Sequence, residues 1–116
     1  MSVLTELNSL LTGLNLPVET GVFSDKAPDE YAVITPLADL FEVYADNRPH
    51  FEVQEARVSL FSKGSYTKRT RQIVTALLGA ELTITERKYI GHEDDIGYHN
   101  YAIDVAKEYS FTEGAD

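Results

Sequence analysis

Hydrophobic residues recur every three or four positions in two stretches of the chain, which is the spacing of an amphipathic helix. Residues 2–14 form the first such stretch, with Ser2 as the expected N-cap. Residues 65–79 form the second, with Ser65 as the expected cap and Gly79 as the end. The residues expected to face inward from this second helix are Tyr66, Thr70, Ile73, Val74 and Leu77.

Elsewhere the hydrophobic residues alternate with polar ones, which is typical of β-strands. The expected strands cover residues 18–23, 31–35, 41–45, 51–61, 82–90 and 98–111. Pro36 is expected to end the second of these, because proline cannot donate a ladder hydrogen bond. The glycines at 91 and 97 bracket an expected loop. His99, Tyr101, Ile103, Val105, Tyr109 and Phe111 are expected to share one face of the last strand.

The stretch 51–61 changes phase along its length. Phe51 and Val53 occupy odd positions, whereas the later apolar residues Ala56, Val58 and Leu60 occupy even ones. One extra residue near Gln54 or Glu55 would bring both sets to the same face, so a β-bulge is expected there. A strand that passes from one layer into another would give the same switch.

These elements predict an α+β fold, an antiparallel or mixed sheet of about four to five strands with two helices packed on one face. The chain is expected to form a single domain, 1–116, in which residues 112–116 are a frayed tail. Two helices cannot cover both faces of such a sheet. A bare face, or the edge of a long strand, is therefore an expected oligomer interface.

Composition and charge exclude several classes of protein. The 116 residues include no cysteine, which excludes disulfides and thiolate metal sites, and no apolar run is long enough for a membrane helix. The net charge of −9 opposes general binding to nucleic acid. One basic cluster contrasts with this background and contains no acid: Lys63, Lys68, Arg69 and Arg71. It is either a solvated helix face or a contact for an acidic partner.

The sequence offers little support for catalysis, and we expect neither enzymatic activity nor a cofactor. No serine lies in a Gly-x-Ser-x-Gly elbow, and the seven glycines form no phosphate loop. The best metal candidate is the run from His92 through Glu93 to Asp95, but its spacing fits no common calcium or zinc motif. We expect a solvated acidic turn there, and we expect His99 to be a packed or interface residue.

Five short segments resemble, in order and spacing, the tail-completion (tail terminator) proteins of long-tailed bacterial viruses of the siphophage type. The resemblance covers nearly the whole chain, and its most telling part is a Tyr-Ala-Asp-Asn turn followed by a Val-x-Leu-Phe-x-Lys strand. The segments are Leu16-Pro17-Val18, Tyr31-Ala32-Val33-Ile34, Tyr44-Ala45-Asp46-Asn47, Arg57-Val58-Ser59-Leu60-Phe61-Ser62-Lys63 and Tyr98-His99-Asn100-Tyr101-Ala102-Ile103.

The resemblance implies a structural role in the virion, at the head–tail interface, after assembly in the host cytoplasm. Proteins of this family form rings, typically hexamers, that cap the tail tube, stop its growth and present a surface to the head-completion (connector) protein. DNA only passes through such a ring, and the acidic net charge suits a lumen that does not hold phosphates. The family supplies no catalytic residues.

The resemblance also suggests where the partners bind. The turn formed by Asp46, Asn47 and Arg48 matches the loop that the family shares, so it is expected to contact a neighbouring subunit or the tube protein. A hairpin turn selected only for its backbone is the alternative. The basic cluster from Lys63 to Arg71 is expected to face an acidic neighbour, away from the lumen.

Two other classes of protein are also consistent with the sequence. One is a small dimeric ligand-binding α+β module, in which the bare sheet face shelters an apolar ligand. The other is a metal-dependent enzyme that uses His92, Glu93 and Asp95.

Overall fold

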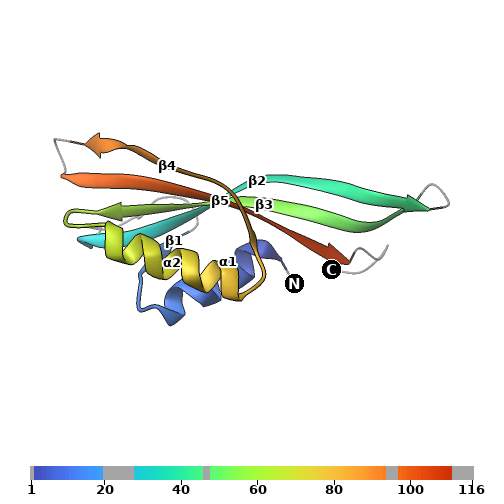
Figure 1. Ribbon diagram of the computed structural model, residues 1–116, viewed down its shortest axis with the longest axis horizontal. Helices are drawn as coiled ribbons and strands as arrows, with labels where there is room; N and C mark the ends of the chain where they lie inside the picture. The colour runs from blue at the N-terminus through green and yellow to red at the C-terminus, as the bar shows by residue number, and fades with distance from the viewer. Residues whose placement is uncertain (1, 20–27, 46–47, 94–96, 111–116) are drawn as a thin grey trace.

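The computed structural model describes residues 2–19, 28–45, 48–93 and 97–110. Its five-stranded sheet has the order β1-β2-β3-β5-β4, in which β1 runs parallel to β2 and the other neighbours are antiparallel. Both helices lie on one face of the sheet (Figure 1), so the predicted α+β fold is confirmed. The elements are α1 (Val3–Gly13), β1 (Val18–Glu19), β2 (Glu30–Ala45), β3 (Arg48–Ser62), α2 (Thr67–Gly79), β4 (Thr83–Glu93) and β5 (Tyr98–Ser110).

The core lies between the helices and the sheet. α1 contributes the leucines of its periodic stripe, and α2 buries Thr70, Ile73 and Leu77, as the helical spacing predicts. The odd residues of β5 from Tyr101 to Val105 face the helices, as predicted, whereas Phe111 lies outside the described residues. The buried apolar residues of this core are Val3, Leu7, Leu11, Leu16, Ala32, Ile34, Ala56, Val58, Leu60, Ile73, Leu77, Leu82, Ile103 and Val105.

The two helices begin differently. Ser2 caps α1 as predicted, since its hydroxyl accepts a hydrogen bond of 3.2 Å from the amide of Thr5. The prediction that Ser65 caps α2 is wrong, because the cap position is Tyr66 and makes no side-chain capping hydrogen bond. The Tyr66 ring stacks on Tyr89 and Tyr101 instead, so packing fixes the start of this helix.

The prediction that Pro36 ends a strand is also wrong. β2 continues through Pro36, and its register against β3 shifts between Pro36 and Ala38. Among the described residues, β1 pairs only with Ala32 and Val33, so Pro36 has no strand to bond on its outer side. Proline is tolerated at such an edge and beside a bulge, which explains why one strand replaces the two expected.

The expected bulge in β3 is absent, because β3 pairs with β5 in unbroken register from Phe51 to Ser62. The bulge lies on the partner strand instead, at Leu37 of β2. Strict alternation therefore places Phe51 and Val53 on the face opposite the helices, while Gln54 lies on the helix face and accepts a hydrogen bond from the amide of Val3.

The turn regions are shorter than the sequence predicts. β4 continues past the expected boundary, through Gly91 to Glu93, after a register shift between Tyr89 and Gly91 that leaves Ile90 unpaired. Residues 20–23 of the first expected strand, the turn at 46–47 and the tail at 112–116 lie outside the described residues.

The molecule is elongated, with extents of 54 × 27 × 24 Å. Its radius of gyration is 15.7 Å, whereas a compact domain of this length has about 13 Å. The cause is visible in Figure 1, where the hairpin of β2 and β3 extends beyond the helices. We call Leu37–Ala45 together with Arg48–Val53 the arm, and we call the sheet face opposite the helices the bare face.

Candidate functional site

Of the three turn residues expected to contact a partner, only Arg48 is among the described residues, at the end of the arm. Asp46 and Asn47 are outside the described residues, and Arg48 is described only by its backbone, which opens β3 opposite Ala45. The predicted contact through this turn therefore lies outside the described residues, apart from the backbone of Arg48.

The basic cluster divides into two pairs. Arg69 is held inside the fold, because its guanidinium donates to Glu30 at 2.9 Å and to the carbonyl of Leu14 at 2.8 Å. Lys63 lies 3.7 Å from the carboxylate of Asp29 and 5.2 Å above the ring centre of Tyr98. Arg69 is therefore a structural brace between α2, β2 and the end of α1, and it is not a free contact for a partner.

Lys68 and Arg71 are exposed and belong to a longer stripe along the outside of α2. Positions 68, 71, 75 and 78 are three or four residues apart, so their side chains lie on one side of the helix. Lys68, Arg71, Thr75 and Leu78 are all exposed, and Leu78 is 58% exposed. We call these four residues the α2 stripe. It is basic at the start of the helix and apolar at the end.

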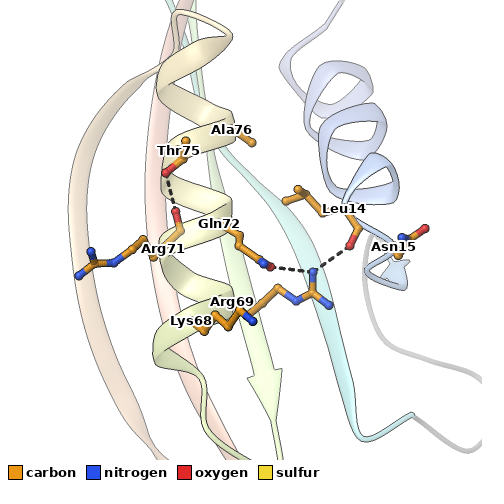
Figure 2. A pocket seen from close by; sticks show the side chains of 8 residues that line it. All are labelled: Leu14, Asn15, Lys68, Arg69, Arg71, Gln72, Thr75 and Ala76. Carbon is orange, nitrogen blue, oxygen red and sulfur yellow. Dashed lines mark hydrogen bonds between the residues drawn. The ribbon is translucent and has the colours of Figure 1, made fainter.

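Open grooves lie on both sides of this stripe. Figure 2 shows the groove of ≈ 590 Å³ between α2 and the end of α1, with Arg69 reaching across to Leu14 and Arg71 pointing away from α1. A second groove lies between α2 and strands β4 and β5, where Arg71 and Arg87 line it together with Tyr66 and Tyr101. Arg71 lines both grooves and is therefore the most central cation of this surface.

The arm carries the opposite chemistry. Leu37, Leu40 and Phe41 are 46%, 51% and 48% exposed. Within its residues the arm has three acids, Asp39, Glu42 and Glu52, and one arginine, and the acids whose side chains are described are Asp39 and Glu52. The arm is thus an acidic projection with large apolar side chains in water, and surfaces of this kind are typical of protein contacts.

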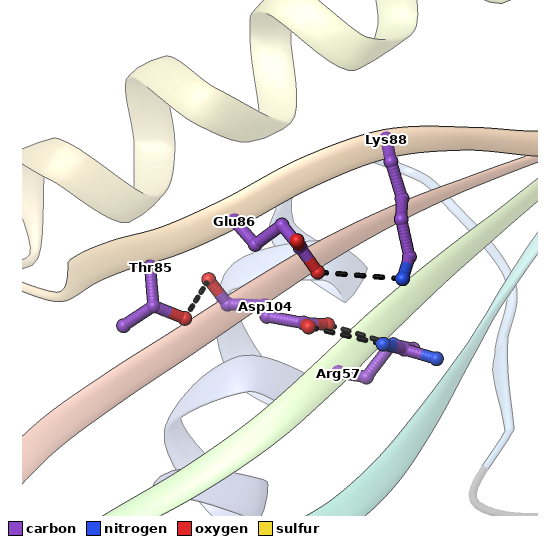
Figure 3. Close-up of polar contacts among 5 residues, drawn as sticks. All are labelled: Arg57, Thr85, Glu86, Lys88 and Asp104. Atoms are coloured by element: carbon purple, nitrogen blue, oxygen red, sulfur yellow. Dashed lines mark hydrogen bonds and ion pairs between the residues drawn. The ribbon is translucent and has the colours of Figure 1, made fainter.

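The centre of the bare face holds an ion pair (Figure 3). Arg57 donates two hydrogen bonds to Asp104, of 2.7 and 3.0 Å, and these raise the pKa of Arg57 despite its partial burial. Glu86 and Lys88 of β4 lie beside it with 3.4 Å between their charged atoms. A polar network therefore occupies the middle of the face that the helices leave uncovered.

The expected metal candidate is only partly described. His92 pairs across the strands with His99, and their ring centres are 4.5 Å apart. Asp95 and the side chain of Glu93 lie outside the described residues. Within the described part of the chain, no three ligating side chains come together. His99 packs against Tyr66 and lies 2.8 Å from the hydroxyl of Tyr89, so it is a packed residue, as expected.

Two features of this surface were not predicted. The Arg57–Asp104 pair joins residues 47 positions apart, and no spacing rule connects them. The arm is the second feature, and the sequence contains one indication of it. Phe51 and Val53 occupy odd positions, which places apolar residues on the face opposite the helices.

Comparisons with known proteins give no further guidance. The chain matches no protein-family model, and no curated protein matches it at a significant level. Among the described residues, no helix is long and apolar enough to cross a membrane. The function therefore has to be argued from the surfaces themselves.

Proposed function

We propose that this protein is a structural virion protein that forms a ring at the end of a phage tail tube. In this proposal the ring, a hexamer when assembled, stops tube growth and provides the surface to which the head-completion protein binds. The protein would act at the head–tail interface of the virion, with DNA passing through the ring. Its partners are copies of itself, the tube protein and the connector, and no specific nucleic-acid contact is involved.

The arm is the observation that carries this proposal. It extends beyond the helix-covered body of the molecule and exposes about half of each of its large apolar side chains, Leu37, Leu40 and Phe41. Beyond Phe51, where the pairing with β5 ends, the projection is two-stranded, and such a hairpin is marginally stable alone in water. The exposed part of its apolar side chains can be buried against another molecule, which gains free energy. A subunit of an assembly has a use for such a projection, whereas an isolated globular domain does not.

The polar centre of the bare face makes the ligand-binding alternative less suitable. An apolar ligand lying on this face would cover the charges of Arg57 and Asp104, and it would offer no hydrogen bonds in place of the water removed. A protein surface with its own polar groups suits this face better. Contact with the tail tube is therefore the preferred use of the bare face.

Light scattering provides the first test of the proposal. The mass is measured first for the protein alone and then with tail tubes from the same genome. We expect an assembly of six times the subunit mass of 13.0 kDa, either free in solution or bound at tube ends. Electron microscopy should then show density at one end of each tube and a tube length that stops increasing. A monomer or strict dimer that leaves tube ends bare and tube growth unchanged would overturn the proposal.

A matched pair of variants separates arm contacts from general surface effects. Leu40→Asp changes an apolar residue of the arm, and Lys88→Asp changes an exposed residue of β4 on the bare face. We expect the first to abolish ring formation and the second to leave it intact while the fold is unchanged by circular dichroism.

A further inference from the structure

We infer that the arm of one copy docks on the α2 stripe of the next copy, and that this head-to-tail contact builds the assembly. The inference rests on the proposed function, because it names the subunit interface of the proposed ring. Its two surfaces are the arm and the residues Lys68, Arg71, Thr75 and Leu78, with Arg87 beside them in the adjoining groove.

Charge is the first reason to pair these two surfaces. The arm has three acids and one arginine, whereas the stretch from Lys63 to Ala80 has four bases and no acid in a chain of net charge −9. Arg69 is used inside the fold, but Lys68 and Arg71 remain exposed. Surfaces of opposite charge associate faster and exclude wrong partners. The acidic arm is therefore better matched to α2 than to α1.

Apolar surface is the second reason. Leu78 at the end of the stripe is 58% exposed. It is the counterpart of Leu40 on the arm, which is 51% exposed. Each surface thus combines exposed apolar surface with a net charge, and the two net charges have opposite signs.

The position of the two surfaces makes the contact heterologous. In Figure 1 the arm extends from one end of the long axis, and α2 begins at the other end. The arm therefore cannot reach the Lys68 end of α2 in its own chain. Contacts between unlike patches generate a ring when the rotation between copies closes, as the proposed function requires.

Two other ways of joining copies are less favourable. A symmetric contact of arm with arm would bring acidic residues face to face. Pairing of sheet edges would meet the bulge at Leu37 on β2 and the two register shifts of β4. Bulges interrupt the hydrogen-bonding pattern of an edge and protect it from adding a strand.

Cross-linking between single-cysteine variants tests the contact directly, since the natural chain has no cysteine. One variant has Leu40→Cys on the arm and another has Thr75→Cys on the stripe, and each is tagged so that the two differ in size. We expect a short bismaleimide linker to join the two variants when they are mixed, and to join neither variant to itself. Lys88→Cys replaces Thr75→Cys as the control and should give no product with Leu40→Cys.

Charge reversal tests the electrostatic part. Arg71→Glu should lower the association constant by about tenfold, because it places an acid opposite the arm. Lys88→Glu makes the same change in net charge on the bare face and should have no such effect. Added salt should weaken association of the natural chain and strengthen that of Arg71→Glu.

The outcomes separate this inference from the proposed function. Cross-linking of Leu40→Cys to itself, or no cross-linking of the mixture with or without tubes, would overturn the head-to-tail contact. Tubes that are capped without the mixed product would leave the proposed function in place and overturn the inference alone. The mixed product without capped tubes would support the contact and count against the tail-terminator function.

Discussion

At the scale of single residues, ion pairs between distant parts of the chain hold the sheet and the helices together. Arg57 and Asp104 are the clearest case, because the pair is bidentate and the Asp104 side chain is only 12% exposed. Charge-assisted hydrogen bonds are stronger than neutral ones in proteins. Removing one partner is costly in stability, because the other charged group is left buried without a hydrogen bond.

Removing either partner should therefore have unequal effects. We expect Arg57→Ala to lower the free energy of unfolding by about 2–3 kcal/mol, because it leaves the carboxylate of Asp104 mostly buried and unpaired. Asp104→Ala should cost about 1–2 kcal/mol, since Arg57 is 31% exposed and regains water. Urea unfolding measures both values, and equal losses would contradict this account.

Glu6 of α1 is the second residue of this kind. Burial acts to raise the pKa of its carboxyl group, but hydrogen bonds from Lys107 and Tyr109 outweigh burial and hold the pKa below its usual value of 4.5. The same Lys107 ammonium donates to the carbonyl of Ala80, just past the end of α2. Burial and the hydrogen bond to Glu6 raise the pKa of Tyr109. The cluster thus ties α1, α2 and β5 together.

This cluster predicts a loss of stability in acid. A carboxyl group whose pKa is lowered by folding stabilises the protein above its unfolded pKa, and the contribution disappears as pH falls through the folded value. We expect Glu6→Gln to be less stable than the natural chain by about 1–2 kcal/mol at pH 7. The difference should shrink as pH falls below 4.5.

Urea unfolding at several pH values measures the difference. Glu81→Gln is the matched control, because Glu81 is exposed. A Glu6→Gln difference that stays constant from pH 7 to pH 3 would show that the contribution does not depend on the charge of Glu6.

At the scale of elements, the two helices end in the same way. After each last turn, one residue takes a left-handed conformation, Asn15 with φ 60° and Glu81 with φ 65°. The next residue, Leu16 or Leu82, returns its amide to a carbonyl of the last turn and is buried. This is the Schellman arrangement, and glycine is its preferred left-handed residue.

Glycine should therefore stabilise the end of α2. We expect Glu81→Gly to raise the free energy of unfolding by about 0.5–1 kcal/mol, because a left-handed conformation strains a residue with a Cβ atom. Asn15→Gly is the matched variant and should give a smaller gain, since asparagine tolerates this conformation. Thermal unfolding would contradict the argument if Asn15→Gly gave the larger gain.

The bulge in β2 leads to a prediction about a deletion. Pro36 pairs with Ala56 and Ala38 pairs with Glu55, so Leu37 is the extra residue between two regular stretches. Deleting Leu37 should restore an unbroken ladder with every other pair unchanged, and it should alter the free energy of unfolding by only about 1 kcal/mol.

A deletion in β3 serves as the control. Val53 pairs with strands on both sides, so its loss shifts two ladders and should destabilise the protein far more than loss of Leu37. Urea unfolding of the two deletions compares them directly. Similar destabilisation would show that the bulge is needed for stability of the body.

The elements also show what sequence patterns can predict. Periodicity located both helices and the helix-facing residues of β5, because helix and strand spacing depends only on local geometry. It failed at Pro36, since whether a proline ends a strand depends on what lies along its outer side. The same limit applies to the candidate surfaces, because local spacing can be predicted and tertiary contacts cannot. Lys63, Lys68, Arg69 and Arg71 were identified from the sequence as one basic cluster. The different role of Arg69 could not be predicted, because it depends on a tertiary contact to Leu14.

At the scale of the whole molecule, stability and assembly belong to different parts of the chain. Among the described residues, no core member comes from the arm, and the body contains the helices and the helix-covered sheet. The arm's exposed apolar residues are available to another molecule without loss of the core. The body is therefore expected to fold without the arm.

An arm-less variant tests this separation. Asp39 lies opposite Gln54, so replacing residues 40–53 by Asn-Gly closes a two-residue hairpin between them. We expect the variant to keep its helix content and to lose no more than about 1–2 kcal/mol of stability, because it removes no core residue and only Phe51–Val53 of the deleted stretch pair with β5. It should remain monomeric under conditions in which the natural chain assembles, as light scattering would show.

Mixing this variant with the natural chain makes the test sharper. The arm-less copy retains its α2 stripe, so it can accept the arm of a natural copy but has no arm to offer the next one. Under head-to-tail docking it should therefore end growing assemblies and reduce the yield of rings in proportion to its share of the mixture. An arm-less copy without effect on that yield would show that the stripe does not receive the arm. Rings built from the arm-less copy alone would show that assembly uses another surface altogether.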